Sequence, residues 1–296
     1  MYEKLKECPV CSSDNILNHK VVKDHSISQE SFVIMKCANC NFQFTNPRPD
    51  QDNIGKFYES DDYISHTNKG NNPINIIYKL VRNYSTQNKI KLIKKISKKD
   101  KAKILDYGTG TGFFLNAIKE KGWKTVGVEP DQKARENAEK LLGQKIYADL
   151  KEIGLLDNKY DVITLWHVLE HIHDLNQVFS TLKGLLKEKG KIIIAVPNID
   201  SLDNKIYKED WAAYDVPRHL YHFNKETLST FTLKHGMKVK NIYPMKFDSY
   251  YISMLSEKYQ KGNGNIVKSI INGYKSNSYA SKNHNNYSSL IFEIKK

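Results

Sequence analysis

The chain lacks the features that would place it across a membrane or mark it as an RNA-binding protein. No apolar run approaches the roughly 18 residues that a membrane-spanning helix needs. Lysine and arginine outnumber aspartate and glutamate by 46 to 33, but there is no RGG stretch and no basic helix with interleaved aromatic residues. Hydrophobic residues make up 40% of the 296 positions, which is typical of a soluble protein. Nucleic acid is therefore a disfavoured partner.

The densest basic run, residues 89–103, has a structural explanation. Its lysines alternate with Ile90, Leu92, Ile93 and Ile96 at helical spacing. This pattern is typical of an amphipathic helix whose charged face is solvated. The length of the chain suits one large core with a small appended module.

Cysteine is scarce, and its spacing is informative. The four cysteines form two C-x-x-C pairs, Cys8 with Cys11 and Cys37 with Cys40, separated by 25 residues. Two such knuckles make a tetrahedral set of thiolates suited to Zn²⁺, and four cysteine ligands leave no position for catalysis. We therefore predict a structural zinc ion.

Other uses of the cysteines are disfavoured. The N-terminal sequence MYEKLKE is charged and short of apolar residues, so we expect no signal peptide and a cytoplasmic location. Thiols stay reduced there, which makes disulfides the weaker interpretation. A redox-active C-x-x-C is weaker still, because neither pair follows a predicted strand and opens a helix.

Residues 103–115, KILDYGTGTGFFL, contain the most informative motif. A buried strand leads to Asp106 and then to Gly108, Gly110 and Gly112, after which a helix is predicted over residues 113–120. Such a strand–turn–helix brings backbone N–H groups and a helix N-terminus close to a ligand.

The spacing of the motif selects the ligand. Dinucleotide enzymes use G-x-G-x-x-G, but here Phe113 stands where the last glycine would fall. Asp106 would repel a pyrophosphate and could accept a hydrogen bond from an ammonium group. Glu129, 17 positions after Gly112 at the end of the next predicted strand, suits the hydroxyls of a ribose. These features favour a ligand with a ribose at one end and an amino acid at the other.

This segment resembles motif I of class I S-adenosylmethionine (SAM) methyltransferases. The resemblance implies an α/β, Rossmann-like sheet, mostly parallel with an antiparallel last strand. It also implies that Asp149 lies near the adenine amino group and that His167, after the fourth strand, belongs to the cofactor site. The parallel strands are expected at residues 104–106, 125–129, 161–166 and 191–196, and the final strand at 287–294.

Residues 1–50 resemble the zinc-binding module of certain bacterial small-molecule and sugar methyltransferases. The resemblance divides the chain into a zinc ribbon (1–50), a helical linker or lid (51–100) and a SAM-dependent domain (101–296). Within the last, residues 198–223 and 247–286 are expected to shape the acceptor pocket, with aromatic side chains as a lid. Residues 262–286 are expected to be mobile or to include a helix over 266–274.

Tyr58 and Tyr63, in the linker, are candidates for contacting the cofactor or the acceptor. Packing between two helices is an equal alternative for these aromatic side chains.

Histidines gather where this fold places the acceptor. His167, His171 and His173 follow the fourth strand, and His219 and His222 follow the fifth. Because histidine titrates near neutrality, we predict that His171, His219 or His222 is the catalytic base. The alternative for each is a hydrogen bond that holds a loop.

The sequence HVLEH raises a second metal site as an open question. It is expected to put His167, Glu170 and His171 on one helical face. Some methyltransferases use E-x-x-E-H with a distant histidine to hold Mg²⁺ or Zn²⁺, but here histidine replaces the first glutamate. The N/D-P-P-Y/F pattern for methylating an exocyclic base amine is absent.

The sequence therefore predicts a SAM-dependent methyltransferase with structural zinc. Its expected acceptor is a hydroxyl or carbon of a small molecule or carrier-linked small molecule, with nucleotide-activated sugars leading. Two alternatives remain. One is an RNA or protein methyltransferase recruited through the ribbon and positive charge, and the other is a non-catalytic SAM-binding or zinc-scaffold protein.

Overall fold

The computed structural model describes residues 1–58, 73–154 and 159–296, without the side chains of residues 73–80 and 154. Tyr63, a predicted contact residue, lies outside the described residues. No helix in the described part of the chain has the length and apolar character needed to cross a bilayer.

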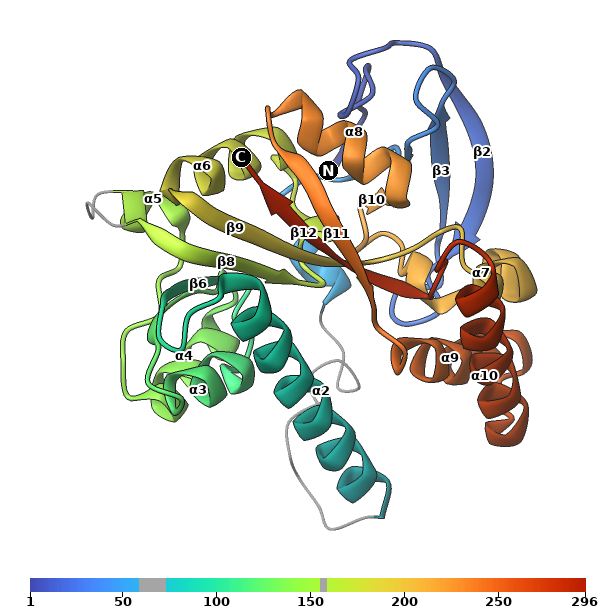
Figure 1. Cartoon of the computed structure of the whole chain (residues 1–296). Helices are drawn as coiled ribbons and strands as arrows, with labels where there is room; N and C mark the ends of the chain where they lie inside the picture. The colour runs from blue at the N-terminus through green and yellow to red at the C-terminus, as the bar shows by residue number, and fades with distance from the viewer. Residues whose placement is uncertain (59–72, 155–158) are drawn as a thin grey trace.

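A six-stranded sheet forms the centre of the larger part of the molecule (Figure 1). Its strand order is β11-β12-β9-β8-β6-β7, and β7, β6, β8 and β9 run parallel. β12 pairs antiparallel with β9 and with β11. The predicted fold class is thus confirmed. The strands are β6 (Lys103–Tyr107), β7 (Lys124–Val128), β8 (Tyr160–Trp166), β9 (Leu186–Pro197), β11 (Lys238–Pro244) and β12 (Ser289–Lys295).

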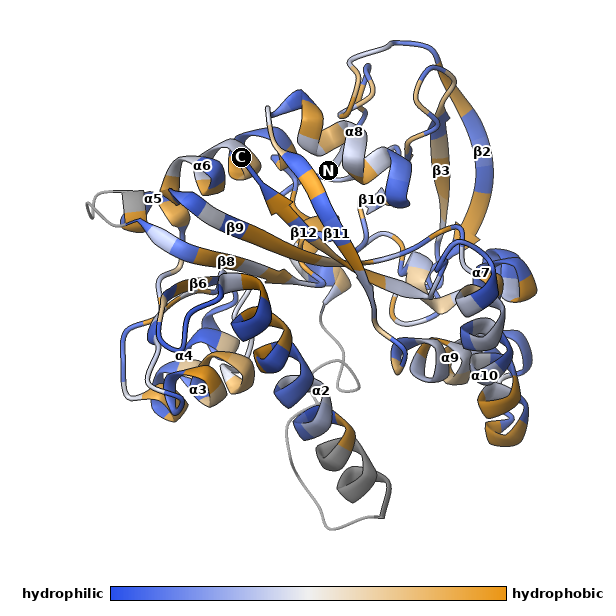
Figure 2. Ribbon diagram, in the orientation of Figure 1, coloured by the Kyte–Doolittle hydropathy of each residue, from blue (hydrophilic) through white to orange (hydrophobic). Residues whose placement is uncertain are grey.

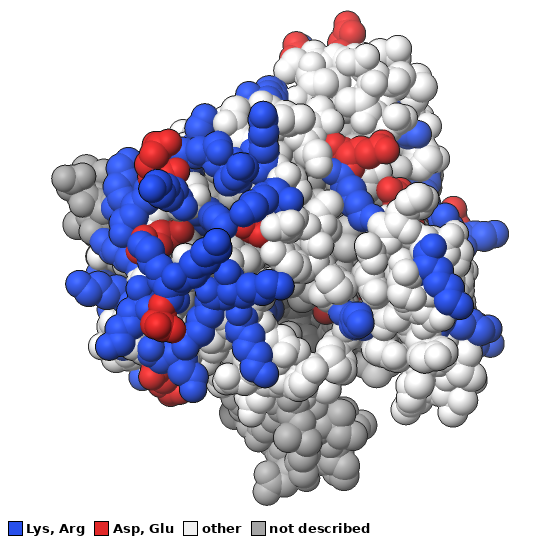
Figure 3. Space-filling view, in the orientation of Figure 1, with Lys and Arg blue, Asp and Glu red and all other residues white. Residues whose placement is uncertain are grey.

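Helices cover both faces of this sheet because its strands are apolar on both sides. One core includes Ile90, Ile93 and Ile96, which confirms the predicted amphipathic helix. The helices are α2 (Pro73–Ser97), α3 (Phe113–Lys119), α4 (Gln132–Leu142), α5 (Leu150–Gly154), α6 (Leu175–Leu185) and α8 (Lys225–Lys234). Lysines gather on the left of the view in Figure 3, where Figure 1 shows the end of α2 and the starts of β8 and β9.

The N-terminal residues form a second, antiparallel sheet that residues 221–222 complete. Its order is β10-β4-β3-β2, and β10 comes from residues 221–222. The strands are β2 (Ile16–Lys23), β3 (Ser31–Cys37), β4 (Gln43–Thr45) and β10 (Tyr221–His222), with β1 (Tyr2–Glu3) paired to β5 (Arg48–Pro49) beside them. This sheet therefore contains strands from both sides of the predicted boundary at residue 50.

Two long helices fill the connection between β11 and β12. α9 (Asp248–Lys261) and α10 (Ile266–Lys282) pack against each other as a hairpin. Of the two expectations for residues 262–286, the helix is confirmed, and it extends eight residues beyond residue 274. Residues 198–223, the other segment expected to shape the acceptor pocket, contain three short helical elements. They are α7 (Leu202–Tyr207), η3 (Lys208–Asp210) and η4 (Ala212–Tyr214).

Of the helical linker expected over residues 51–100, α2 confirms residues 73–97, whereas residues 51–58 contain only a short 3-10 helix, η1 (Ile54–Phe57). The HVLEH segment is also not an α-helical face, because His167 adopts a left-handed conformation (φ 56°) and only a 3-10 turn, η2 (Leu169–His171), follows. The reversal at His167 turns the chain back at the end of β8.

Candidate active site

The glycine turn joins β6 to α3 and leaves part of its backbone open. Gly112 has φ +85°, which favours glycine, and a Cβ there would also lie 3.1 Å from Cα of Ala138 in α4. Gly110 has φ +55°, and a Cβ added to it would have no heavy atom within 4 Å. The space above Gly110 is therefore open to a ligand, as the sequence predicts.

Glu129 lies directly beside this turn. One carboxylate oxygen, Oε2, accepts a hydrogen bond from the Gly110 N–H at 2.7 Å, and Oε1 accepts from the Asp131 N–H at 3.0 Å. Burial raises the pKa of Glu129. The structure thus brings the predicted glycine turn and the predicted ribose-binding carboxylate together at the carboxyl ends of β6 and β7.

Asp106 is buried at the end of β6, with 2% of its surface exposed. Its Oδ1 accepts a hydrogen bond from Thr164 Oγ1 at 2.6 Å. Burial raises the pKa of Asp106 to about 7, although Thr164 and the charge of Lys89 act in the opposite direction. Sequence reasoning missed Lys89, whose ammonium lies 4.4 Å from the centroid of the Trp166 ring, because its role depends on how α2 packs on the sheet.

Asp149 occupies the same edge of the sheet. Tyr147 forms a parallel bridge with Val128, and its carbonyl accepts a hydrogen bond from the Glu129 N–H at 2.8 Å. Asp149 follows two residues later, is exposed, and accepts a hydrogen bond from the Lys151 N–H at 2.8 Å. Its carboxylate is therefore accessible near the end of β7.

His167 is held between two carboxylates. Its Nδ1 lies 3.3 Å from Glu170 Oε1 and its Nε2 lies 3.0 Å from Asp248 Oδ2. Burial alone would lower the pKa of His167, but the hydrogen bonds to Asp248 and Glu170 raise it to about 9. His167 is therefore cationic at neutral pH. Asp248 carried no local sequence signal, since it is 81 residues away.

His171 and His219 form a ring pair. Their ring centroids are 4.6 Å apart, and Nδ1 of each ring lies beside a backbone carbonyl, that of Arg218 for His171 (3.0 Å) and that of Ala213 for His219 (2.8 Å). Because a carbonyl can only accept, Nδ1 of each ring carries a proton. Nε2 of His219 lies 3.9 Å from Asp215 Oδ2. Burial and the neighbouring His219 lower the pKa of His171 to about 4. Tyr58 also contacts His171 Nδ1 through its hydroxyl, at 3.0 Å.

Glu170 completes a cluster with these two histidines. One atom from each of Glu170, His171 and His219 lies within 4.8 Å of the others, an arrangement that could hold a metal ion. Glu170 is fully buried, and its Oε2 has no hydrogen-bond partner among the described residues. His219, distant in sequence, is thus a third potential ligand beside Glu170 and His171, and the question of a second metal stays open.

His222 and His173 lie outside this cluster. His222 Nε2 lies 3.2 Å from the hydroxyl of Thr45, which itself donates to the His219 carbonyl at 2.8 Å. His173 lies 3.0 Å from the Pro49 carbonyl through Nε2, so it holds a loop. His222 remains a predicted base. It lies in β10, and the Thr45 hydroxyl connects its ring to the backbone of His219.

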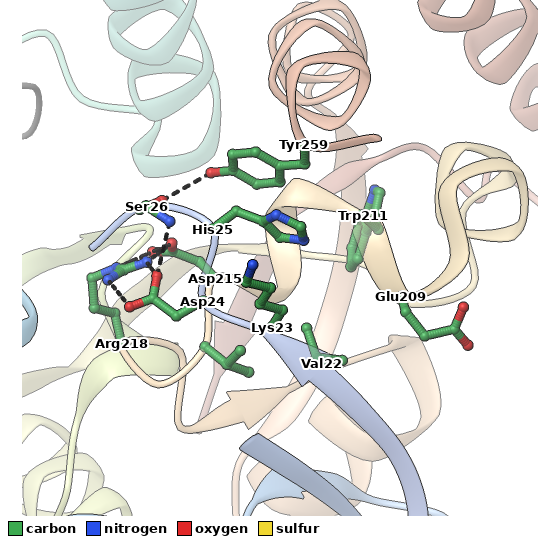
Figure 4. A pocket seen from close by; sticks show the side chains of 11 residues that line it. Val22, Lys23, Asp24, His25, Ser26, Glu209, Trp211, Asp215, Arg218 and Tyr259 are labelled. Carbon is green, nitrogen blue, oxygen red and sulfur yellow. Dashed lines mark hydrogen bonds and ion pairs between the residues drawn. The ribbon is translucent and has the colours of Figure 1, made fainter. Parts of the chain in front are cut away.

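A buried ion pair fixes the segment that carries His219. Arg218, with 1% of its surface exposed, donates to Asp24 Oδ1 at 3.0 Å and to Asp215 Oδ1 at 2.6 Å. Figure 4 shows both carboxylates pointing toward the guanidinium. The adjoining cavity, of about 10 Å³, has room for one water molecule at most, so this is a structural centre.

The four cysteines come together in the N-terminal module. Sγ of Cys8 lies 3.5 Å from Sγ of Cys40, the Cys11–Cys37 distance is also 3.5 Å, and all four lie within 4.8 Å of one another. Tetrahedral ligands at the usual Zn–S distance of about 2.3 Å would be about 3.8 Å apart. The cluster is thus compatible with the predicted zinc site.

The fold and this arrangement of residues define a Rossmann-like protein of the methyltransferase class. Residues 81–240, more than half of the chain, match the model of a family described as the methyltransferase domain. The chain belongs to this family.

Relatives and structural neighbours agree with the family. A Methanocaldococcus jannaschii protein, the uncharacterized protein MJ0638, is 30% identical over 132 residues, which are 45% of this chain and 57% of the relative. The demethylmenaquinone methyltransferase of Thermotoga maritima is 31% identical over 112 residues, 36% of this chain and 49% of the relative. The chain thus spans about half the length of these curated relatives.

Two solved structures with bound S-adenosylhomocysteine (SAH) share the fold. The magnesium protoporphyrin IX methyltransferase ChlM of Synechocystis PCC 6803 has a TM-score of 0.53 and 14% identity, covering 83% of this chain and 99% of its own. The plantazolicin methyltransferase BpumL has a TM-score of 0.52 and 18% identity, covering 81% and 92%. At these identities the likeness concerns the fold.

The buried ion pair gives a test of stability. Arg218→Ala should lower the free energy of unfolding by about 3–5 kcal/mol, because it leaves Asp24 buried without its cation. Lys140→Ala, on the exposed side of α4, should change it by less than about 0.5 kcal/mol. Denaturant unfolding of both variants measures the difference, and equal stabilities would show that the pair contributes little.

Proposed function

We propose that the chain binds SAM and transfers its methyl group to a hydroxyl or carbon of a small or carrier-linked molecule. One observation supports this most: in a chain of the methyltransferase family, Glu129 is hydrogen-bonded to the open Gly110. When bound, SAM supplies an electrophilic methyl group. The protein then has to align the acceptor, exclude water and accept a proton.

The residues on the cofactor side fit the two ends of such a ligand. Glu129 offers two carboxylate oxygens to ribose hydroxyls, and Gly110 lets the backbone approach closely. Asp106 is the proposed partner of the amino-acid ammonium. Asp149 is exposed at the edge of the sheet, as a contact with the adenine amino group requires. His167, cationic between its two carboxylates, suits the wall of the cofactor site and is unsuited to act as a base.

The acceptor side offers two imidazoles, His171 and His219. With its Nδ1 proton directed at a carbonyl, Nε2 of His171 can accept a hydrogen bond, and then a proton, from an acceptor hydroxyl, and His219 is the second candidate. The low pKa of His171 keeps it unprotonated but makes it a weak base. Glu170, buried beside both rings, would stabilise the imidazolium that forms, which offsets this weakness. His222 acts in this proposal as a support for His219.

A groove beside the acceptor segment supports an anionic acceptor such as a nucleotide-activated sugar. It has a volume of about 250 Å³ and lies between the N-terminal sheet and α7. His19, Lys20, Lys205 and Lys208 line it together with Asp200 and Glu209. The phenol of Tyr214, also in its wall, accepts a hydrogen bond from Lys20 Nζ at 2.7 Å and packs against His222. A phosphate in the groove would thus be separated from His222 by the ring of Tyr214.

The four-cysteine cluster is proposed to hold structural Zn²⁺. Burial raises the pKa of Cys8 to about 11, so a bound cation is needed to keep that thiol deprotonated. In this proposal residues 1–50 are a zinc ribbon whose sheet holds the acceptor wall, residues 51–100 form the linker and lid, and residues 101–296 carry the transferase.

The observations disfavour the alternatives. The lysine-rich surface of Figure 3 lies at the starts of β8 and β9, whereas the glycine turn and the histidines follow the strands' carboxyl ends. A nucleic acid held there would be remote from the site. A non-catalytic SAM-binding protein would have no need for a buried His171–His219–Glu170 cluster.

Cofactor binding is the first test. Asp106→Asn and Glu129→Gln should each weaken SAH binding by about 1.5–3 kcal/mol in calorimetry, because each removes a charge-assisted hydrogen bond. Asp52→Asn, on the exposed surface, is the control. Absence of a binding heat from folded wild-type protein would remove the proposal.

The pH dependence of binding should identify Asp106. Its carboxylate must be ionised to hold an ammonium group, and its pKa is about 7 without one. Affinity should therefore fall by up to about tenfold for each pH unit below 7 and level off above it. Asp106→Asn should abolish this dependence, and an unaltered profile in that variant would assign the proton to another group.

The roles of His171 and His219 are tested by turnover once an acceptor is found. His171→Ala and His219→Ala should each lower kcat by about a hundredfold or more at saturating SAM. His284→Ala, an exposed histidine, should leave kcat unchanged. If no variant is slower, alignment alone carries the reaction. Turnover that EDTA abolishes and a divalent cation restores would instead show that Glu170, His171 and His219 hold a metal.

The zinc proposal needs no acceptor. Elemental analysis should find one zinc per chain after dialysis, and Cys37→Ser should unfold the N-terminal sheet, as seen by hydrogen exchange of residues 16–45. Asp14→Ala, exposed near the same knuckle, should retain both zinc and protection. A fully folded, metal-free protein would contradict the proposal.

A further inference from the structure

The hairpin of α9 and α10 has an apolar outer face. Ile266 is 64% exposed, Val267 68%, Ile270 54% and Tyr274 65%, and these positions follow one side of α10. On α9, Met254 is 42% exposed. Figure 2 shows hydrophobic colour on the turns of α10 at the lower right of the molecule. Isolated exposed apolar residues are ordinary, but a continuous stripe of them marks a contact surface.

The buried face of α10 is small and polar, whereas α9 also buries the apolar Ile252 against the rest of the protein. Ser269, Gly273 and Ser276 of α10 face inward, as do Ser249 and Ser253 of α9. The Ser249 hydroxyl donates to the Gly273 carbonyl at 3.1 Å, and a Cβ on Gly273 would lie 2.7 Å from Cδ1 of Tyr250. The two helices are therefore packed closely through small residues.

The arrangement of α10 is the reverse of that in a water-soluble helix, which buries its apolar stripe and exposes its polar one. Close packing through small residues with apolar residues outside is how helices associate in an apolar medium. The outer face of this hairpin therefore suits surroundings less polar than water.

The charges of the hairpin narrow the choice of partner. Its two acids are both engaged, Asp248 with His167 at 3.0 Å and Glu257 with Lys268 at 2.8 Å. Its remaining charged residues are exposed lysines, namely Lys258, Lys261, Lys275 and Lys282. A second copy would bring these same positive charges together, whereas anionic lipid headgroups complement them.

The apolar surface continues to the active site. Phe247, which precedes α9 and is 45% exposed, has its ring centroid 5.2 Å from that of Tyr84 on α2, which is 55% exposed. The next residue, Asp248, is the partner of His167. The apolar rim thus extends from the hairpin to the edge of the site.

We propose that the α9–α10 hairpin docks on an anionic lipid surface, with its apolar stripe in the interfacial layer and its lysines among the headgroups. This goes beyond the proposed methyl transfer, and neither depends on the other. It makes the protein peripheral, since an amphipathic helix of this kind lies in the plane of the interface.

Vesicle flotation of the full-length protein tests the proposal. Protein should float with vesicles of phosphatidylcholine containing phosphatidylglycerol, and less with phosphatidylcholine alone. Val267→Ser with Ile270→Ser should reduce the partition coefficient by about tenfold or more, because two apolar side chains leave the interface. Leu141→Ser with Leu233→Ser, two exposed leucines on α4 and α8, is the matched control and should float as the wild type does.

Three outcomes would overturn the proposal. They are no flotation with either vesicle, equal flotation of the hairpin variant and the wild type, and a dimer in light scattering that the hairpin variant dissociates. SAH binding by each variant reports folding independently. Loss of flotation with SAH binding intact would therefore concern the hairpin, and loss of SAH binding in the wild type would concern the proposed function.

Discussion

The pairing of β10 with β4 is the constraint that fixes the backbone around His219. Through it, Tyr221 lies opposite Phe44 and His222 opposite Gln43, so two residues of the larger domain complete the N-terminal sheet. Thr45 strengthens the connection by donating its hydroxyl to the His219 carbonyl and its N–H to Leu220. The position of His219 is therefore fixed by a module whose own fold we attribute to a metal-bound cysteine cluster.

Glu170 lies beside two histidines whose proton affinities differ. Its Oε1 lies 3.3 Å from Nδ1 of His167, which Asp248 also contacts, and that ring is cationic. Burial and the neighbouring ring of His219 lower the pKa of His171, although the charge of Glu170 acts in the opposite direction. Coulomb attraction therefore prevails at His167 and desolvation at His171. The same carboxylate thus adjoins a cationic ring and a neutral one.

The sequence predicted those parts whose physical cause is local. The strand before Gly108 is apolar and short, the glycines have a fixed spacing, and each cysteine pair forms its own knuckle. Glu129 was found because one helix and one strand separate it from the turn. Lys89, Asp248 and the contact between Glu170 and His219 were not found, because each depends on packing between segments distant in sequence.

The strand β11 and the exposed stripe of α10 were not predicted from the sequence, for a different reason. β11 alternates lysine and asparagine with apolar residues and lies at the edge of the sheet, so its sequence lacks the continuous apolar run of the inner strands. For α10, the sequence predicted a helix over residues 266–274 but not that its apolar stripe would be exposed. Small residues line the side of α10 that meets the protein. Periodicity identifies a helix, but it does not tell which of the two faces meets the protein.

Helix α9 connects the hairpin to the site at the end of β8. Asp248 is the first residue of that helix, and its carboxylate helps to keep the proton on His167. Because α9 is rigidly packed on α10 through small residues, a displacement of the hairpin would move Asp248 with it. Loss of the Asp248 contact would leave His167 with Glu170 alone and lower its pKa, since one of the two carboxylates that raise it would be gone. The charge of the site at the end of β8 thus depends on how the hairpin is held.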